Sequence, residues 1–376
     1  MCSIVSKSTP YGNPNNFETF DFQDGDWEKV PYWPYAHGGE RHEDEDLFLR
    51  TSLRTPEFKK AFLNVETAKP EATVYLNGKQ IGTAGLAPTR IDITYSQLKD
   101  QDNVIAAQVY NEKVVPATHM STDLNSGVFL GRSFIDLVNP DHLTDIFVRT
   151  ASIGDEAVLN VDVQALADKD GFKGSAEIVI TPWYPVEDRK QKSQETISVM
   201  LSADESKRFQ TQVSVKSARL WSPEAPNLYK VHVILKDKDG NAVDDMVQTT
   251  GIRTITQDGG VVRLNSKPTM LNGPLVFQHF APLERVAQWM WAPPATELVR
   301  QILMVKEMNG NTIRMSVHES SHGGAHDPRM AELCDQLGMM LMWQSSAWHR
   351  QSRMPNFDCQ IGLSYHQNGL AANIGW

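Results

Sequence analysis

Three histidines spaced four residues apart are the best arranged for metal chemistry in this sequence. His318, His322 and His326 would share one face of a helix, and histidine is a common ligand of zinc. Gly323 and Gly324 lie between them, and adjacent glycines interrupt a helix. We therefore expect a solvated loop here, and we predict no metal and no other cofactor.

Other groups with reactive side chains do not form a recognisable cofactor site either. The acidic run Glu43–Asp46 lacks the glycine and the spaced oxygen ligands of a calcium loop, so a charged surface turn is expected. The three cysteines, Cys2, Cys334 and Cys359, form no closely spaced pair, which indicates neither a disulfide framework nor a zinc site. Gly-rich phosphate loops and Gly-x-Ser-x-Gly motifs do not occur in the sequence.

The composition is typical of ordinary globular domains. Of the 376 residues, 40% are hydrophobic and 22% are charged, and this length predicts two or three domains. The formal net charge of −10 argues against a nucleic-acid partner. The sequence contains no apolar run of about 18 residues, and Met1–Lys7 lacks the apolar region of a signal peptide. We expect a soluble protein, cytoplasmic or periplasmic, with no membrane partner; the oligomeric state stays open.

The elements expected before residue 257 are short β-strands. In Ala72–Gly82, apolar and polar residues alternate, and Asn77-Gly78 supplies the pair with positive φ that a two-residue hairpin needs. Further strands are predicted at Asn103–Tyr110, Ser133–Val138, Asp145–Arg149, Ala157–Val163, Ala176–Ile180 and Tyr229–Leu235. This spacing favours one β-sandwich at residues 1–140 and a second, immunoglobulin-like one at residues 141–256.

From Gln257 onward, the sequence pattern changes to alternating strands and helices. Thr296 is a plausible N-cap of the first helix, and Asp327 with Pro328 is expected to open the second, which Gly338 would close. The predicted elements are a helix at Leu298–Met308, a strand at Thr312–Val317, a helix at Arg329–Leu337 and a strand at Met339–Trp343. Such a succession predicts a parallel sheet or barrel.

Four places in the sequence resemble glycoside hydrolase family 2, and they occur in the family's order. Val74–Gly82 is similar to the hairpin of its sugar-binding jelly roll, and Ser126–Leu130 is similar to the end of that domain. Leu220–Tyr229 and Gly251–Ile255 are similar to "L-W-S-P-E-x-P-x-L-Y" and "G-F/I-R" of its immunoglobulin-like domain. Asn311–Arg314 and Leu333–Gly338 are similar to the second strand and second helix of its (β/α)8 barrel. Each similarity is weak by itself, and together they indicate the family.

This resemblance implies a jelly-roll sugar-binding-like domain at residues 1–140, an immunoglobulin-like β-sandwich at 141–256 and the N-terminal, incomplete part of a TIM barrel at 257–376. It also implies a retaining glycosidase, in which two glutamates about 5–5.5 Å apart flank the O-glycosyl bond of a β-glycoside. Because a complete barrel needs about 250 residues, the chain is expected to lack both glutamates and to be inactive alone.

The resemblance further implies a substrate-binding wall at the carboxyl ends of the barrel strands. Arg314 closes the second strand, where the family has an arginine, and its guanidinium suits a carboxylate or sugar hydroxyls. The alternative is that Arg314 braces a neighbouring catalytic carboxylate. His318 lies one residue further along than in the family's R-x-S-H, so it either hydrogen-bonds the substrate or is an ordinary loop histidine.

Four more residues complete this candidate wall. Trp343 and Gln344 end the third strand and resemble the W-Q-D of β-mannosidase-like members, with Ser345 in the place of the acid. Trp343 would stack on the apolar face of a sugar or pack in the core. Trp348 lies in the following loop, and His279 lies near the end of the first strand.

Two other classes of protein stay open. The chain could be a non-catalytic carbohydrate-binding β-sandwich protein, although few aromatic residues occur on its predicted first-domain strands. A structural or adhesive β-protein is disfavoured by the alternating strands and helices after Gln257. For an enzyme, the sequence does not distinguish a mannoside, galactoside, glucuronide or glucosaminide substrate.

Overall fold

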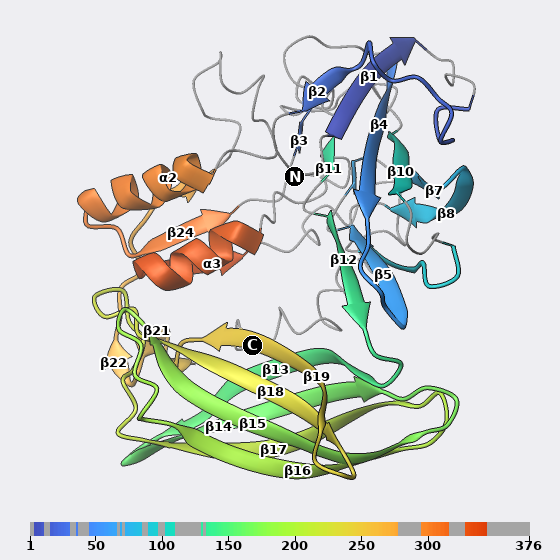
Figure 1. The fold of residues 1–376 in the computed structure, drawn as a ribbon. Coiled ribbons are helices and arrows are strands. Elements are labelled where there is room, and N and C mark those ends of the chain that lie inside the picture. Colours follow the sequence, from blue (N-terminus) through green and yellow to red (C-terminus); the bar gives the residue numbers. More distant parts are fainter. Residues whose placement is uncertain are drawn as a thin grey trace.

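The structure, a computed structural model, describes twelve stretches of the chain and arranges them in seven β-sheets and two helices (Figure 1). The described residues are 4–10, 16–30, 35–36, 45–65, 68–69, 72–84, 89–96, 102–109, 129–130, 133–276, 295–315 and 328–343. Neither helix in this part of the chain has the length and apolar character needed to cross a membrane.

The first part of the chain forms a β-sandwich of antiparallel strands. One layer is a six-stranded sheet in the order β2 (Glu28–Val30), β1 (Ile4–Pro10), β4 (Glu45–Arg54), β10 (Asp102–Val109), β7 (Ala72–Leu76) and β8 (Lys79–Ala84). The facing layer contains β12 (Ser133–Val138), β5 (Lys60–Val65) and β9 (Thr89–Asp92), and a small sheet joins β3 (Tyr35–Ala36), β11 (Phe129–Leu130) and β6 (Ala68–Lys69). Buried Val74 and Leu76 of one layer share a core with Leu63 of the other.

The predicted Asn77-Gly78 hairpin is present between β7 and β8. Asn77 has φ 52° and Gly78 has φ 83°, as a two-residue turn with two positive φ values requires. The Asn77 side chain fixes the turn to the next strand, because its Oδ1 accepts a hydrogen bond of 2.8 Å from the backbone N–H of Val104. The backbone conformation of Asn77 and Gly78 therefore sets how the residues of β7 and β8 pair.

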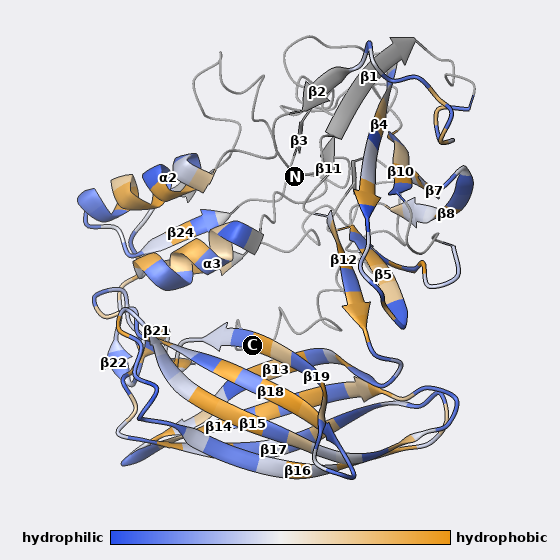
Figure 2. Cartoon of the chain, viewed as in Figure 1, coloured by the Kyte–Doolittle hydropathy of each residue, from blue (hydrophilic) through white to orange (hydrophobic). Residues whose placement is uncertain are grey.

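A second β-sandwich follows and contains the largest core. Its sheets are β13 (His142–Ile153), β14 (Glu156–Leu166) and β17 (Ser206–Lys216), facing β16 (Ser193–Leu201), β15 (Phe172–Tyr184), β18 (Leu228–Asp237) and β19 (Ala242–Thr250). Apolar and polar residues alternate along these strands (Figure 2). Leu159 and Val161 of β14 pack with Ile178 of β15, and all three are fully buried. All four strands predicted in this stretch are confirmed, as β13, β14, β15 and β18, and no range was predicted for β16, β17 or β19.

A parallel sheet with two helices follows a small antiparallel sheet of β20 (Ile255–Asp258), β21 (Val261–Leu264) and β22 (Lys267–Pro268). The parallel strands are β23 (Leu275–Val276), β24 (Thr312–Met315) and β25 (Met340–Trp343), and the helices are α2 (Ala295–Glu307) and α3 (Pro328–Leu337). Leu298 and Ile302 of α2 pack with Ile313 of β24. Three parallel strands confirm the predicted alternation, and the described residues form no closed barrel.

The helix ends confirm most of the predicted signals. α3 begins at Pro328 and is followed by Gly338 with φ 70°, which is the left-handed residue that ends many helices. The prediction of Thr296 as an N-cap was wrong, because α2 begins at Ala295 and Thr296 lies in its first turn.

We predict that Gly78→Ala destabilises the first sandwich by about 1 kcal/mol, because alanine is strained at positive φ. Urea unfolding measures the change. Gly25→Ala is the control, since an added Cβ at Gly25 meets no atom within 4 Å and its backbone is not left-handed. Equal unfolding midpoints for the two variants would contradict the account of the turn.

Candidate functional site

The carboxyl ends of the three parallel strands meet at one edge of their sheet. Val276, Met315 and Trp343 are paired across the sheet, so the three strands end level with one another. Parallel βα units bind ligands at this edge, where the strands end and their loops begin. The candidate site is therefore the carboxyl edge of β23, β24 and β25.

Two of the predicted site residues are brought together at this edge. Arg314 has an exposed side chain one residue before the end of β24. Trp343 is the last residue of β25 and is paired with Met315, next to Arg314 in the chain; its side chain is not among the described ones. Four other predicted site residues lie outside the described residues: His279, His318, Gln344 and Trp348.

The titratable side chains of Cys334 and Glu297, on the helices beside the parallel sheet, have the character of structural groups. Burial raises the pKa of the Cys334 thiol to about 12, with a smaller contribution from Asp335, so this thiol stays protonated at neutral pH. Glu297 is buried and accepts hydrogen bonds from Arg300 and Gln301 on its own helix. Within the described stretches, no three histidine, cysteine or acidic side chains lie close enough to hold a metal ion.

The parallel sheet is held on the second sandwich by a junction centred on Trp221, the second residue of the motif Leu220–Tyr229. The Trp221 indole is 1% exposed, and its Nε1–H donates a hydrogen bond of 2.8 Å to the backbone carbonyl of Asp335 in α3. Its own backbone N–H donates to the carbonyl of Ile252 at 2.9 Å. One side chain thus connects two segments far apart in the chain.

The motif that begins at Gly251 forms the other wall of this junction. A Cβ at Gly251 would lie 2.8 Å from the Cβ of Trp221, so only glycine fits against the indole. The guanidinium carbon of Arg253 lies 4.9 Å from the centre of a Trp221 ring, and its Nη2 lies 4.0 Å from Oδ1 of Asp335. Burial raises the pKa of the Asp335 carboxyl, and Arg253 opposes that rise.

Lys306 completes the junction from α2. Its ammonium donates hydrogen bonds to the backbone carbonyls of Leu337 at 2.7 Å, Gly338 at 3.1 Å and Pro223 at 3.1 Å. The first two carbonyls end α3, where a cation is favourable, and the third belongs to the sandwich. These junction residues were not predicted as a site, although the motifs that contain most of them were recognised.

The described residues form antiparallel β-sandwiches that carry a parallel βα unit. Residues 141–253 match the profile of Glycosyl hydrolases family 2. The resemblance to this family predicted from four sequence motifs is thereby confirmed, and two of those motifs lie at the junction.

Similar proteins extend the match beyond those residues. A protein of Formosa agariphila is 26% identical over 391 residues, covering 94% of this chain and 35% of its own length. A beta-galactosidase of Photobacterium profundum is 34% identical over 131 residues, covering 35% of this chain and 12% of its own. The solved structure of Bacteroides uniformis beta-glucuronidase is similar in fold, with a TM-score of 0.70, 24% identity, and 91% of this chain and 42% of that chain covered. The chain therefore spans less than half the length of each of these relatives.

We predict that Trp221→Phe destabilises the protein by about 1–3 kcal/mol, because it leaves the Asp335 carbonyl without its buried donor. Chemical denaturation with hydrogen exchange of the α3 backbone measures the loss. Trp183→Phe is the matched control, since the half-buried Trp183 indole has no hydrogen-bond partner among the described residues. An unchanged stability of Trp221→Phe would refute the role given to its N–H group.

Proposed function

We propose that this chain is the N-terminal part of a glycosidase that hydrolyses the O-glycosyl bonds of β-glycosides. The family match of residues 141–253 supports the proposal, together with a parallel βα unit docked on that stretch through Trp221. The observation that carries it is the level ending of β23, β24 and β25, since such an edge forms the floor of a barrel active site.

In this proposal, residues 1–140 form a jelly roll, residues 141–256 form an immunoglobulin-like sandwich, and residues 257–376 begin a TIM barrel. The family resemblance supports this division. In the structure, the sheet partners change between β12 and β13, where the chain leaves the first sandwich for the second.

The proposed mechanism is retaining and uses two glutamates. One carboxylate attacks the anomeric carbon and forms a covalent glycosyl-enzyme, while the second, protonated, carboxyl group gives its proton to the leaving oxygen. The second group, now a carboxylate, then takes a proton from water, which attacks the anomeric carbon and releases the first carboxylate. No residue of this chain is assigned to either role, because both glutamates are proposed to lie in the remainder of the barrel.

This chain is proposed to supply the non-catalytic wall of the pocket. Arg314, an exposed residue, would hold a sugar carboxylate or hydroxyls through its guanidinium. His279 and His318 each follow a paired strand end by three residues in the sequence. Gln344 follows Trp343 directly, and Trp348 follows it by five residues. All six are proposed substrate-binding residues.

The substrate class is tested with the complete encoded protein and a panel of p-nitrophenyl β-glycosides: galactoside, glucuronide, mannoside and N-acetylglucosaminide. We expect release of p-nitrophenol from at least one β-glycoside, and a product that first appears as the β-anomer in NMR because two displacements retain configuration. The chain of 376 residues alone is expected to release none above the blank.

Hydrolysis by the isolated chain would contradict the placement of the glutamates elsewhere. An α-anomeric first product would contradict the retaining mechanism. If the complete protein cleaves nothing but titration calorimetry detects saturable binding of a sugar, the carbohydrate-binding alternative gains support.

We predict that Arg314→Ala in the complete protein lowers kcat/KM for its best glycoside by about 10- to 100-fold, since a charge-assisted hydrogen bond contributes about 1.5–3 kcal/mol. Steady-state kinetics measures the effect. Arg208→Ala is the control, because Arg208 is also partly exposed and pairs with Asp145 on the second sandwich, away from the parallel sheet. Equal kinetics for both variants would remove Arg314 from the site.

A further inference from the structure

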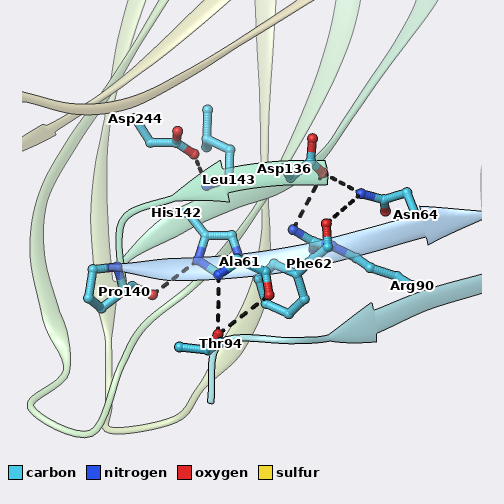
Figure 3. Close-up of polar contacts among 10 residues, drawn as sticks. All are labelled: Ala61, Phe62, Asn64, Arg90, Thr94, Asp136, Pro140, His142, Leu143 and Asp244. Atoms are coloured by element: carbon cyan, nitrogen blue, oxygen red, sulfur yellow. Dashed lines mark hydrogen bonds and ion pairs between the residues drawn. The ribbon is translucent and has the colours of Figure 1, made fainter. Parts of the chain in front are cut away.

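The first and second sandwiches meet in a small buried seam, which we define by Phe62 and Arg90 on the first side and His142, Leu143 and Asp244 on the second (Figure 3). The Asp244 carboxylate accepts a hydrogen bond of 2.7 Å from the backbone N–H of Leu143. The linker between the sandwiches is also held in place, since the side-chain amide of Asn139 donates a hydrogen bond to the backbone carbonyl of Val243. These bonds hold Leu143 and Asp244 together on the second side of the seam and fix the linker to that side.

His142 is the one seam residue with a buried side-chain polar atom that has no hydrogen-bond partner among the described residues. It is 0% exposed, and its Nδ1 lies 3.0 Å from the carbonyl oxygen of Pro140. A carbonyl can only accept, so Nδ1 carries the proton and the lone pair of the neutral ring is on Nε2. Nε2 is buried with no hydrogen-bond partner in the described part of the chain. Protonation would thus create a buried N–H donor without an acceptor.

The charges around His142 also oppose its protonation. The His142 ring lies 5.7 Å from the Phe62 ring, centre to centre. The same Phe62 ring is covered by the Arg90 guanidinium, with Cζ 3.8 Å from the ring centre, and by Lys60, with Nζ at 5.5 Å. The Phe62 ring that His142 contacts is therefore also contacted by two cations.

Acidic groups are present, but each has another partner. Asp136 of β12 lies 3.8 Å from Arg90 and accepts a hydrogen bond of 2.9 Å from Asn64. Asp244 of β19 accepts from Leu143, as described above. The charged groups that face the seam are Lys60 on β5, Arg90 and Asp92 on β9, Asp136 on β12 and Asp244 on β19. Burial is the largest cause of the lowered pKa of His142; the hydrogen bond to Pro140 opposes it, Arg90 adds to it, and smaller contributions from Asp244 and Lys60 act in opposite directions.

We propose that this seam is a pH-sensitive contact, in which neutral His142 holds the two sandwiches together and protonated His142 releases them. The proposal goes beyond the glycosidase function, because it concerns only the docking of two parts of this chain. It needs no ligand and no catalytic residue.

The direction of the pH effect follows from the lowered pKa. The open seam exposes His142 to water and returns its pKa toward the ordinary value of about 6.5, so the open form binds the proton more readily. The contribution of neutral His142 to docking of the two sandwiches is fully present above pH 6.5. It is lost as the pH falls from 6.5 toward the lowered pKa of His142 in the docked form. Between the two values, the opening equilibrium changes by up to about tenfold per pH unit. Burial raises the pKa of Asp244, which acts in the opposite direction in more acidic solution.

Hydrogen exchange followed by mass spectrometry on the full chain tests the proposal at pH 7.5 and 5.5, after correction for the intrinsic pH dependence of exchange. We expect residues 139–146 to lose protection by up to about tenfold at the lower pH, relative to residues 157–163 in the core of the second sandwich. His142→Asn should abolish this loss, because its amide can donate to the Pro140 carbonyl but does not titrate.

His232→Gln is the matched control. His232 is a partly exposed histidine of the second sandwich with Nε2 2.8 Å from Asp245, and its replacement should leave the seam's pH response intact. The same loss of protection in His142→Asn, or none in the natural chain, would overturn the proposal. If His142→Asn fails to fold, an NMR titration of the natural chain decides: a His142 pKa at or above 6.5 refutes the proposal, and a lower value supports it.

Discussion

The buried hydrogen bond from the Trp221 indole to the Asp335 carbonyl is the contact on which the placement of the parallel sheet depends. An indole N–H removed from water needs an acceptor, so α3 must lie where its backbone can supply one. Gly251 leaves room for the ring, and the Arg253 guanidinium lies over it. The sandwich thereby fixes α3, and α3 packs on the strands whose carboxyl ends form the candidate site.

Local chemistry in the sequence accounts for most of the elements that were predicted correctly. Asn77-Gly78 and Gly338 are found at positive φ because a tight turn and a helix end both require it. Strands with one buried face, such as β14, show the expected alternation. β16 and β17 were missed because most of their side chains are exposed, so polar residues interrupt the apolar pattern that marks a strand.

The candidate site was predictable to the extent that it depends on strand order. Successive βα units bring strand ends to one edge, which is why Arg314 and Trp343 lie on neighbouring strands. The junction was not predictable in this way, since Trp221 and Asp335 are 114 residues apart and no periodicity relates them. The motif Leu220–Tyr229 indicated a family, but only the contacts show that it docks a helix.

Lys306 joins the two helices of the βα unit to each other and to the second sandwich. Its bonds to Leu337 and Gly338 close loops of 31 and 32 residues, whereas its bond to Pro223 spans 83. Short loops close with less loss of chain entropy, so the two bonds to α3 cost less chain entropy to form than the bond to Pro223. The lysine of α2 that caps the carbonyl end of α3 therefore also holds both helices to the sandwich.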